Sequence, residues 1–364
     1  MKKIKLGVIF GGMSTENEVS VASATSVLNS LNREKYEVFP VYIDKDGTWY
    51  QFLEQEKKRE FGQEIKNKEK IQDVIEYLRK LDVLFPVLHG LYGEDGTIQG
   101  LFELLQKPYV GCGVLASSVG MDKAYTKIIF DKAGLKQANY EYIRKYKENY
   151  IYVTKDFKEE ILSCEEIVEK TSNNLNFPMF VKPSNSGSSV GIRKVENKNE
   201  LKEAIDYAAK FDRKILIEEG IIGKEVECAV LGNEEVKASC VGQIKSAAEF
   251  YDYDAKYKNQ ESRTEIPADI PKEISEEIRK QAIRAFKAID CKGLARVDFF
   301  IEDKSNEIYI NEINTLPGFT NISLYPKLWE ESGISYTELL DKLIELSKIE
   351  GAYICVFFYK KTET

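Results

Sequence analysis

The feature that most restricts the fold is an alternation of strand and helix patterns through the first third of the chain. Residues 4–10 form a mostly apolar run that indicates a buried strand, and two glycines follow it. Similar runs at 38–43 and 81–88 are separated by a segment with apolar residues at helical spacing. Strands that alternate with helices predict a parallel α/β unit. We also expect Thr15 and Glu18 to form a capping box before the first helix.

The chain is longer than one hydrophobic core usually allows, since it has 364 residues. The predicted segments are an N-terminal α/β domain at 1–120, a central subdomain at 121–213, a C-terminal subdomain at 214–350 and a tail at 351–364. A strand at 215–217 is expected to open the C-terminal subdomain. The tail contains an apolar run at 353–359 that fits either an added edge strand or an exposed apolar terminus, and the pattern leaves both open.

Composition excludes several classes of protein. Hydrophobic residues make up 43% of the chain and charged residues 31%, which is typical of a water-soluble globular protein. The net charge is -8 and the lysines and arginines are dispersed, so we expect no nucleic-acid partner. We expect neither a signal peptide nor a membrane span, because the apolar runs are too short. Six cysteines without a C-x-x-C pair suggest free thiols in a cytoplasmic protein.

Histidine is almost missing from the sequence, because His89 is the only one. A metal cluster with several histidine ligands is therefore excluded, and a Ser-His-Asp triad would depend on this single residue. Catalysis has to use carboxylates, lysines, arginine, hydroxyl groups and a hard metal ion.

Two strand patterns near the end of the chain, at 294–301 and 307–313, place polar residues inside apolar runs. The polar residues that alternation places on a common face are Arg296, Asp298, Glu312 and Asn314. A hairpin centred on Ser305 would put Asp298 opposite Glu312. Two carboxylates and an amide oxygen suit Mg²⁺. The alternative is a solvated strand face with a surface salt bridge, but the polar run into the turn at 315–318 argues against it.

Three further segments and Lys123 carry groups suited to binding or covering a nucleotide, and each of these signals is weak by itself or has a simpler alternative. The Gly- and Ser-rich loop at 182–189 offers backbone N–H groups and Lys182 to phosphates, or it is a flexible hairpin turn. Lys123 taken alone fits a surface helix. The strand and bend at 215–221, with Glu225 behind them, could bind adenosine, which is a weak indication by itself. The aromatic and charged segment at 250–257 fits a lid over a site or a set of half-buried surface tyrosines.

In this order, and over nearly the whole chain, these motifs resemble the ATP-grasp superfamily and, within it, the D-alanine:D-alanine ligases. The matching motifs are Gly-Gly-x-Ser-x-Glu-x-Glu-Val-Ser at 11–20, His-Gly-x-x-Gly-Glu-Asp-Gly at 89–96, Met-Asp-Lys at 121–123, Gly-Ser-Ser-Val-Gly at 187–191, Tyr-x-x-Lys-Tyr at 253–257, Arg-Val-Asp at 296–298 and Asn-Glu-Ile-Asn-Thr-x-Pro-Gly at 311–318. The resemblance implies an ATP-grasp architecture, in which an N-terminal parallel α/β domain precedes two α+β subdomains that clasp ATP.

The resemblance also implies roles for individual residues. Those implied to bind ATP are Lys123, Lys182, Ser188, Glu218, Glu219, Ile221, Glu225 and Lys256. Those implied to bind two Mg²⁺ or Mn²⁺ ions are Asp298, Glu312 and Asn314. Those implied to bind D-alanine are Glu16, His89, Lys256, Arg296, Gly318, Ser323 and Leu324. Those implied to act in catalysis are Glu16, Ser188, Tyr257, Arg296 and Gly318.

The implied reaction joins two D-alanines through an acyl phosphate, forms ADP and supplies a peptidoglycan precursor. Homodimerisation and activation by K⁺ are expected from the resemblance as well. Glu219 and the pair Asn321-Ile322 depart from the commoner family pattern, so a D-alanine:D-serine ligase or another ATP-grasp carboxylate–amine ligase stays an alternative. Tyr257 after Lys256 favours an amine acceptor over D-lactate. A nucleotide-binding regulator is a further alternative, but it would not need an oxyanion-stabilising arginine.

Overall fold

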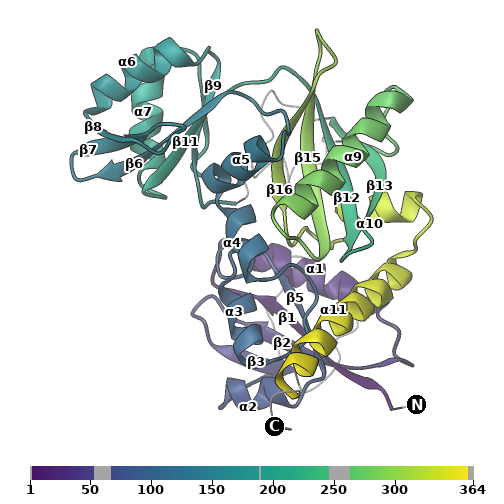
Figure 1. Cartoon of the computed structure of the whole chain (residues 1–364). Coiled ribbons are helices and arrows are strands. Elements are labelled where there is room, and N and C mark those ends of the chain that lie inside the picture. Colours follow the sequence, from purple (N-terminus) through teal and green to yellow (C-terminus); the bar gives the residue numbers. More distant parts are fainter. Residues whose placement is uncertain (1, 53–66, 188–189, 246–262, 360–364) are drawn as a thin grey trace.

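The computed structural model describes residues 2–52, 67–187, 190–245 and 263–359, and these residues form three β-sheets with helices packed against them (Figure 1). The N-terminal sheet lies at the bottom of the view, the central sheet at the upper left and the C-terminal sheet at the upper right. The α/β class and the ATP-grasp architecture predicted from the sequence are confirmed.

The N-terminal sheet has the strand order β4-β3-β2-β1-β5. Its parallel strands are β1 (Ile4–Gly11), β2 (Tyr36–Ile43) and β5 (Val83–Leu88). Two antiparallel strands, which the sequence patterns did not predict, extend one edge: β3 (Trp49–Phe52) and β4 (Lys68–Lys70). The helices of this region are α1 (Asn17–Ser30), α2 (Val74–Arg79), α3 (Thr97–Leu104) and α4 (Val114–Met121).

The predicted capping box before α1 is wrong. The N-cap residue is Glu16, and its side chain makes no capping hydrogen bond. The turn is instead fixed by Ser14, whose Oγ donates to His89 O at 2.6 Å and accepts from Glu16 N at 3.2 Å. This turn is therefore held by the end of β5, and the contact brings Glu16 and His89 close together.

The central sheet has the order β10-β9-β11-β6-β7-β8. Its strands are β6 (Tyr140–Tyr146), β7 (Asn149–Val153), β8 (Glu159–Leu162), β9 (Met179–Pro183), β10 (Arg193–Val195) and β11 (Lys214–Glu219), and the nearby helices are α5 (Lys123–Lys132), α6 (Cys164–Asn174) and α7 (Lys198–Ala208). β11 pairs with β9 and β6, so the strand expected to open the C-terminal subdomain belongs to the central sheet instead. The division into domains otherwise stays a prediction.

The C-terminal sheet has the order β14-β13-β12-β15-β16. Its strands are β12 (Gly223–Gly232), β13 (Lys237–Lys245), β14 (Arg263–Glu265), β15 (Gly293–Glu302) and β16 (Ile308–Asn314), and its helices are α9 (Lys272–Ala288) and α10 (Leu324–Glu331). The hairpin of β15 and β16 pairs Asp298 with Glu312 as predicted. The register then shifts by one residue after Asp298, which is a β-bulge.

The last helix, α11 (Tyr336–Tyr359), runs through most of the predicted tail, so residues 353–359 are helical and do not form an added edge strand. It lies beside the N-terminal sheet (Figure 1), and its Asp341 accepts hydrogen bonds from Lys35 and Tyr36. One continuous hydrophobic core joins β1, β2 and β5 to α10, α11 and Phe319, and Phe85 meets Phe319 edge-on at 6.0 Å between ring centroids. The loop after β16 is therefore packed against the N-terminal domain.

Among the described residues, no helix combines the length and the apolar character that a membrane span requires.

Candidate active site

A group of charged and polar side chains on the C-terminal sheet, which we call the arginine cluster, comprises Glu227, Arg296, Asp298 and Asn314. Arg296 forms a forked pair with Asp298, with Nε 2.8 Å from Oδ1 and Nη2 2.7 Å from Oδ2. Its Nε also lies 2.9 Å from Glu227 Oε2 on β12, and Asn314 Nδ2 donates to Asp298 Oδ2 at 3.0 Å. Glu227, Asp298 and Glu312 stand opposite one another across three neighbouring strands.

Burial and charge act in opposite directions on Arg296. Burial alone would lower the pKa of the guanidinium, but the carboxylates of Asp298 and Glu227 outweigh it and hold the pKa well above the ordinary value. Asp298 and Glu227 are almost completely buried. Arg296 is therefore a permanent cation in a place of low dielectric, where it can stabilise negative charge that develops in a reaction.

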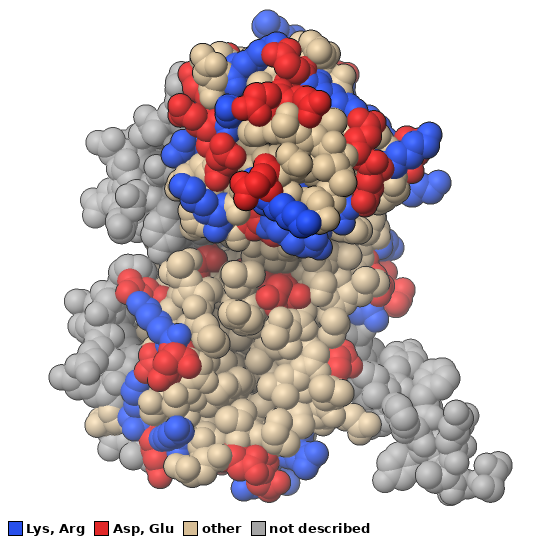
Figure 2. All heavy atoms as spheres, turned by 90° about the vertical axis from the view of Figure 1, so that its left-hand side faces the viewer, with Lys and Arg blue, Asp and Glu red and all other residues tan. Residues whose placement is uncertain are grey.

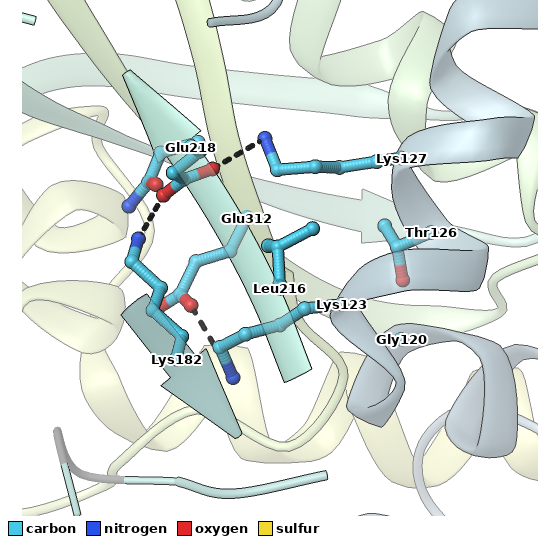
Figure 3. Close-up of a pocket in the computed structure, with 9 residues that line it drawn as sticks. Gly120, Lys123, Thr126, Lys127, Lys182, Leu216, Glu218 and Glu312 are labelled. Carbon is cyan, nitrogen blue, oxygen red and sulfur yellow. Dashed lines mark hydrogen bonds and ion pairs between the residues drawn. The ribbon is translucent and has the colours of Figure 1, made fainter. Parts of the chain in front are cut away.

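A pocket lies between α5, β9, β11 and β16 (Figure 3). Lys123, the first residue of α5, donates from Nζ to Ser186 O at 2.6 Å and lies 3.9 Å from Glu312 Oε2. The Gly- and Ser-rich loop and the predicted metal carboxylate therefore meet at one lysine. Asp122 caps α5 by accepting from Tyr125 N, and Ser184 Oγ donates to Asp122 at 2.7 Å, which fixes the base of the loop against this helix.

Lys127, Lys182 and Glu218 line the same pocket and form what we call the glutamate cluster. Glu218 is only 4% exposed, and its two oxygens face Lys182 and Lys127, the latter at 2.9 Å. Figure 3 shows the two lysines reaching Glu218 from β9 and from α5. Burial raises the pKa of this carboxyl group, but the two lysines outweigh it and lower the pKa to about 2. Glu218 is thus ionised at neutral pH.

The N-terminal domain contributes Glu16 and His89, which are both buried. A side chain at Gly90 would place Cβ 2.5 Å from Glu16 Oε2, and one at Gly187 would place it 3.0 Å away, so the backbone of the Gly- and Ser-rich loop lies against this carboxylate. His89 Nε2 is 3.0 Å from Ser23 Oγ, and Phe319 N donates to the same hydroxyl at 3.3 Å. Ser23 thus connects the histidine to the loop after β16.

The remaining predicted residues surround these groups. Gly318 lies against Ser323, because a Cβ at position 318 would be 2.8 Å from Ser323 Oγ, and Leu324 is buried next to it. Ile221 and Glu225 are partly buried where β11 leads into β12. Glu219 accepts hydrogen bonds from Asn176 and Asn139, so its carboxylate already has two protein partners. Ser188, Lys256 and Tyr257 lie outside the described residues.

Three residues at the site were not predicted. Lys127 follows Lys123 by one helical turn, a spacing that places both on one face of α5 and that could have indicated it. Glu227 follows Glu225 by two residues, so strand alternation puts both on one face of β12. Ser23 stands in an apolar helix face and gave no signal, because its partners come from distant parts of the chain.

The predicted metal ligands are neighbours in the β15–β16 hairpin. The donor set contains two carboxylates and one amide, and because Asn314 Nδ2 donates to Asp298, the amide oxygen is the atom left for a cation. Such a set fits a hard ion that also takes water and phosphate oxygens. No group of three or more His, Cys, Asp or Glu side chains suited to a metal occurs in the described part of the chain. The metal site therefore stays a prediction.

Comparison with known proteins identifies the family. The family model described as "D-ala D-ala ligase N-terminus" matches residues 5–112, and the one described as "D-ala D-ala ligase C-terminus" matches residues 129–345. The D-alanine–D-alanine ligase of Acetivibrio thermocellus is 52% identical over 95% of this chain and 96% of that relative. D-alanine–D-alanine ligase B of Clostridium tetani is 49% identical, and the match covers 95% of this chain and 94% of that protein.

Two solved structures resemble the whole molecule. The VanG D-Ala:D-Ser ligase from Enterococcus faecalis has a TM-score of 0.82 and 37% identity, and the match covers 95% of this chain and 100% of that one. The D-alanine–D-alanine ligase from Coxiella burnetii has a TM-score of 0.81 and 32% identity, covering 99% and 98% respectively. Because sequence and structure agree over both halves of the molecule, the chain belongs to the D-alanine–D-alanine ligase family.

Proposed function

We propose that this protein joins two D-alanine molecules into D-alanyl-D-alanine, with conversion of ATP to ADP and phosphate, and that the product supplies peptidoglycan synthesis. The observation that carries the proposal is a series of contacts that joins three kinds of group. Lys123 and Lys182 line one pocket with Glu312, which stands opposite Asp298 of the arginine cluster. Lys123 also contacts the Gly- and Ser-rich loop, and that loop lies against Glu16 of the N-terminal domain. The relatives named D-alanine–D-alanine ligase support the choice of substrate.

ATP would lie in the pocket between the central and C-terminal sheets. Lys123 and Lys182 neutralise its phosphates, together with backbone N–H groups of the loop. Glu218, Glu219, Ile221 and Glu225 surround adenosine. Since the carboxylate of Glu219 is held by two asparagines, its contribution would come from the backbone of β11. The resemblance adds Ser188 and Lys256 to this set.

Asp298, Glu312 and Asn314 would hold Mg²⁺ or Mn²⁺, which supplies positive charge to the phosphate oxygens. Arg296 holds Asp298 in place through the forked pair. Lys123 adds a second cation within 3.9 Å of Glu312. Activation by K⁺ stays a prediction of the resemblance.

The two D-alanines would lie between the N-terminal domain and the loop after β16. Glu16 binds the ammonium group of the first, and His89, held by Ser23, lies near its carboxylate. Ser323, Leu324 and Lys256 face the carboxylate end of the second. Ser188 and Tyr257 would join two lids that keep water away from the reactive intermediate.

The reaction would proceed in two displacements. A carboxylate oxygen of the first D-alanine attacks the γ-phosphorus, the bond to the bridging oxygen breaks, and ADP leaves an acyl phosphate. The neutral amine of the second D-alanine then attacks the acyl carbon, phosphate leaves with the bonding electrons, and the amine gives its proton to solvent. Arg296 and the Gly318 N–H stabilise the tetrahedral oxyanion. No covalent enzyme intermediate is required.

A second candidate is D-alanyl-D-serine formation, which is favoured by the likeness to a D-Ala:D-Ser ligase and by Asn321-Ile322 beside the acceptor pocket. Competition between D-alanine, D-serine and D-lactate at fixed ATP and Mg²⁺, with products identified by mass, tests both candidates. We expect D-alanyl-D-alanine as the main product near neutral pH and D-alanyl-D-serine as a minor one, because an apolar pocket rejects an added hydroxyl only about 100-fold. A preference for D-serine or D-lactate would overturn the dipeptide assignment. Absence of any ATP-dependent product would overturn the ligase assignment.

The resemblance also leads us to propose a homodimer formed through the side of the N-terminal domain that carries α3 and α4. Figure 2 shows a broad area there with Lys, Arg, Asp and Glu mostly along its edges. Leu104 and Leu115 are 85% and 63% exposed on these helices. Such a patch suits a self-complementary contact. The double variant Leu104→Glu and Leu115→Glu should have the mass of a monomer by light scattering, whereas Ile161→Glu on β8 should stay dimeric.

The proposed location is the cytoplasm, where ATP is available. Cys112, Cys164, Cys228, Cys240 and Cys291 are free thiols, which agrees with a reducing compartment.

A further inference from the structure

The glutamate cluster contains one more cation than its single carboxylate can balance. Lys182 and Lys127 both approach Glu218, and all three side chains are buried or nearly so. Burying charged groups costs free energy unless they are paired. A buried cation beyond the number of carboxylates therefore suggests a function. Lys182 has a proposed role in binding the phosphates of ATP, because it stands at the end of β9 where the Gly- and Ser-rich loop begins. Lys127 has none in the reaction described above.

The surroundings of the two lysines differ, and the difference suggests a separate role for each. Lys182 lies next to the loop, so it can turn from Glu218 to an incoming phosphate. Lys127 is 3% exposed, and its Nζ stands 5.4 Å from the centre of the Tyr140 ring. Its backbone oxygen accepts from Gln137 Nε2 at 2.9 Å, which fixes this turn of α5. Lys127 therefore remains beside Glu218 when Lys182 leaves.

We propose that Lys127 is a positioning residue that makes the enzyme select ATP over 6-oxopurine nucleotides. By staying paired with Glu218, it keeps that carboxylate ionised while Lys182 binds phosphate. An ionised carboxylate accepts a hydrogen bond from the 6-amino group of adenine and repels the 6-oxygen of hypoxanthine or guanine. The inference rests on the proposed binding of adenosine at Glu218.

Removal of Lys127 would change the chemistry of the pocket in a defined way. Once Lys182 has turned to phosphate, Glu218 would be a buried carboxylate without a cation, and burial would then favour its protonated form. A protonated carboxyl group can donate a hydrogen bond to a 6-oxygen. Selectivity between 6-amino and 6-oxopurines should therefore fall, and it should fall further as the pH is lowered.

The test compares ATP with inosine 5′-triphosphate, which has a 6-oxygen and an N1–H where ATP has a 6-amino group and an unprotonated N1. The ratio of the two dissociation constants is measured by calorimetry without amino acids, and the ratio of kcat/KM with D-alanine. In the unaltered protein both ratios should be constant between about pH 6 and about pH 8. In Lys127→Met they should fall about 10- to 100-fold, the value of a hydrogen bond to a charged group, and fall most at the lower pH.

Two further variants show whether Lys127 determines the selection of ATP or has a merely structural role. Lys127→Arg keeps the charge and should restore selectivity for ATP in large part. Lys132→Met on the exposed side of α5 should leave both ratios unchanged. In a folded Lys127→Met protein, equal losses for the two nucleotides, or a selectivity that does not change with pH, would overturn the proposal. Since the binding ratio needs no D-alanine, a failure of dipeptide formation in the unaltered protein would count against the proposed function and not against the role of Lys127.

Discussion

The arginine cluster and the glutamate cluster both bury a carboxylate between cations, but they are built differently. The arginine cluster lies within one sheet, on the adjacent strands β12, β15 and β16, and its arginine is two residues from its main partner. The glutamate cluster draws one residue each from α5, β9 and β11. We expect a cluster within one sheet to keep its geometry when a ligand binds. A cluster shared by three elements can exchange a partner, and we infer that ATP binding requires this.

The largest effect is expected from Arg296→Met, which would break the arginine cluster. Glu227 and Asp298 would be left buried beside an apolar side chain, and breaking a buried pair in this way costs about 3–5 kcal/mol of stability. Urea unfolding measures this loss, and dipeptide formation should become undetectable because the oxyanion also loses its cation.

Arg296→Lys keeps the charge without the planar fork, so it should recover part of the stability but little of the activity. A stable and active Arg296→Met protein would contradict the view that this cluster is a fixed unit.

The next effect is a loss of turnover that leaves stability nearly unchanged, and it is expected from Glu312→Gln. Glu312 is only partly buried and lies at the edge of the arginine cluster, so Glu312→Gln should leave the free energy of unfolding nearly unchanged. If Glu312 is a metal ligand, turnover should fall on the order of 100-fold or more, since a metal contributes several kcal/mol to phosphoryl transfer. The measurement is the rate of phosphate release as a function of Mg²⁺.

The control for this variant is Glu307→Gln. Glu307 is exposed just before β16 on the same hairpin, so its variant should behave like the unaltered protein. Near-normal Mg²⁺-dependent turnover in Glu312→Gln would remove Glu312 from the metal site.

A smaller effect on stability, which changes with pH, is expected from Glu218→Gln in the glutamate cluster. The folded protein lowers the pKa of Glu218 from 4.5 to about 2, so the carboxylate stabilises the fold above about pH 4.5. That stability is lost as the pH falls from about 4.5 towards about 2, and its size is on the order of 3 kcal/mol.

Urea unfolding of the two proteins should therefore show a difference at neutral pH that shrinks at about pH 3. A difference that is independent of pH would mean that Glu218 is not held ionised by its two lysines.

The same contrast explains what could be predicted from the sequence. The pairing of Asp298 with Glu312 followed from alternation and from the hairpin, because both are local properties of neighbouring strands. Lys127 and Glu218 are 91 residues apart in the chain, and only the packing of α5 on β11 brings them together. The place of β11 in the central sheet was missed for the same reason, since its partners are chosen by tertiary contacts. Motif resemblance supplied Glu16 and His89, which no periodicity would have singled out.

The smallest effect is expected from Lys136→Met, which tests whether burial is what distinguishes both clusters from ordinary ion pairs. Lys136 contacts Glu307 on the same hairpin that carries Asp298 and Glu312, but the two side chains are 45% and 50% exposed. Water screens such a pair, and holding two long side chains in one geometry costs about as much as it returns. The backbone oxygen of Lys136 accepts a hydrogen bond from Ile310 N, and methionine at this position would keep that contact. Unfolding midpoint and turnover should both stay within experimental error of the unaltered protein, in low salt and in high salt. A clear loss of stability in Lys136→Met would mean that ion pairs on this hairpin matter by their position and not by their burial, and the contrast between the clusters and the surface would then need another explanation.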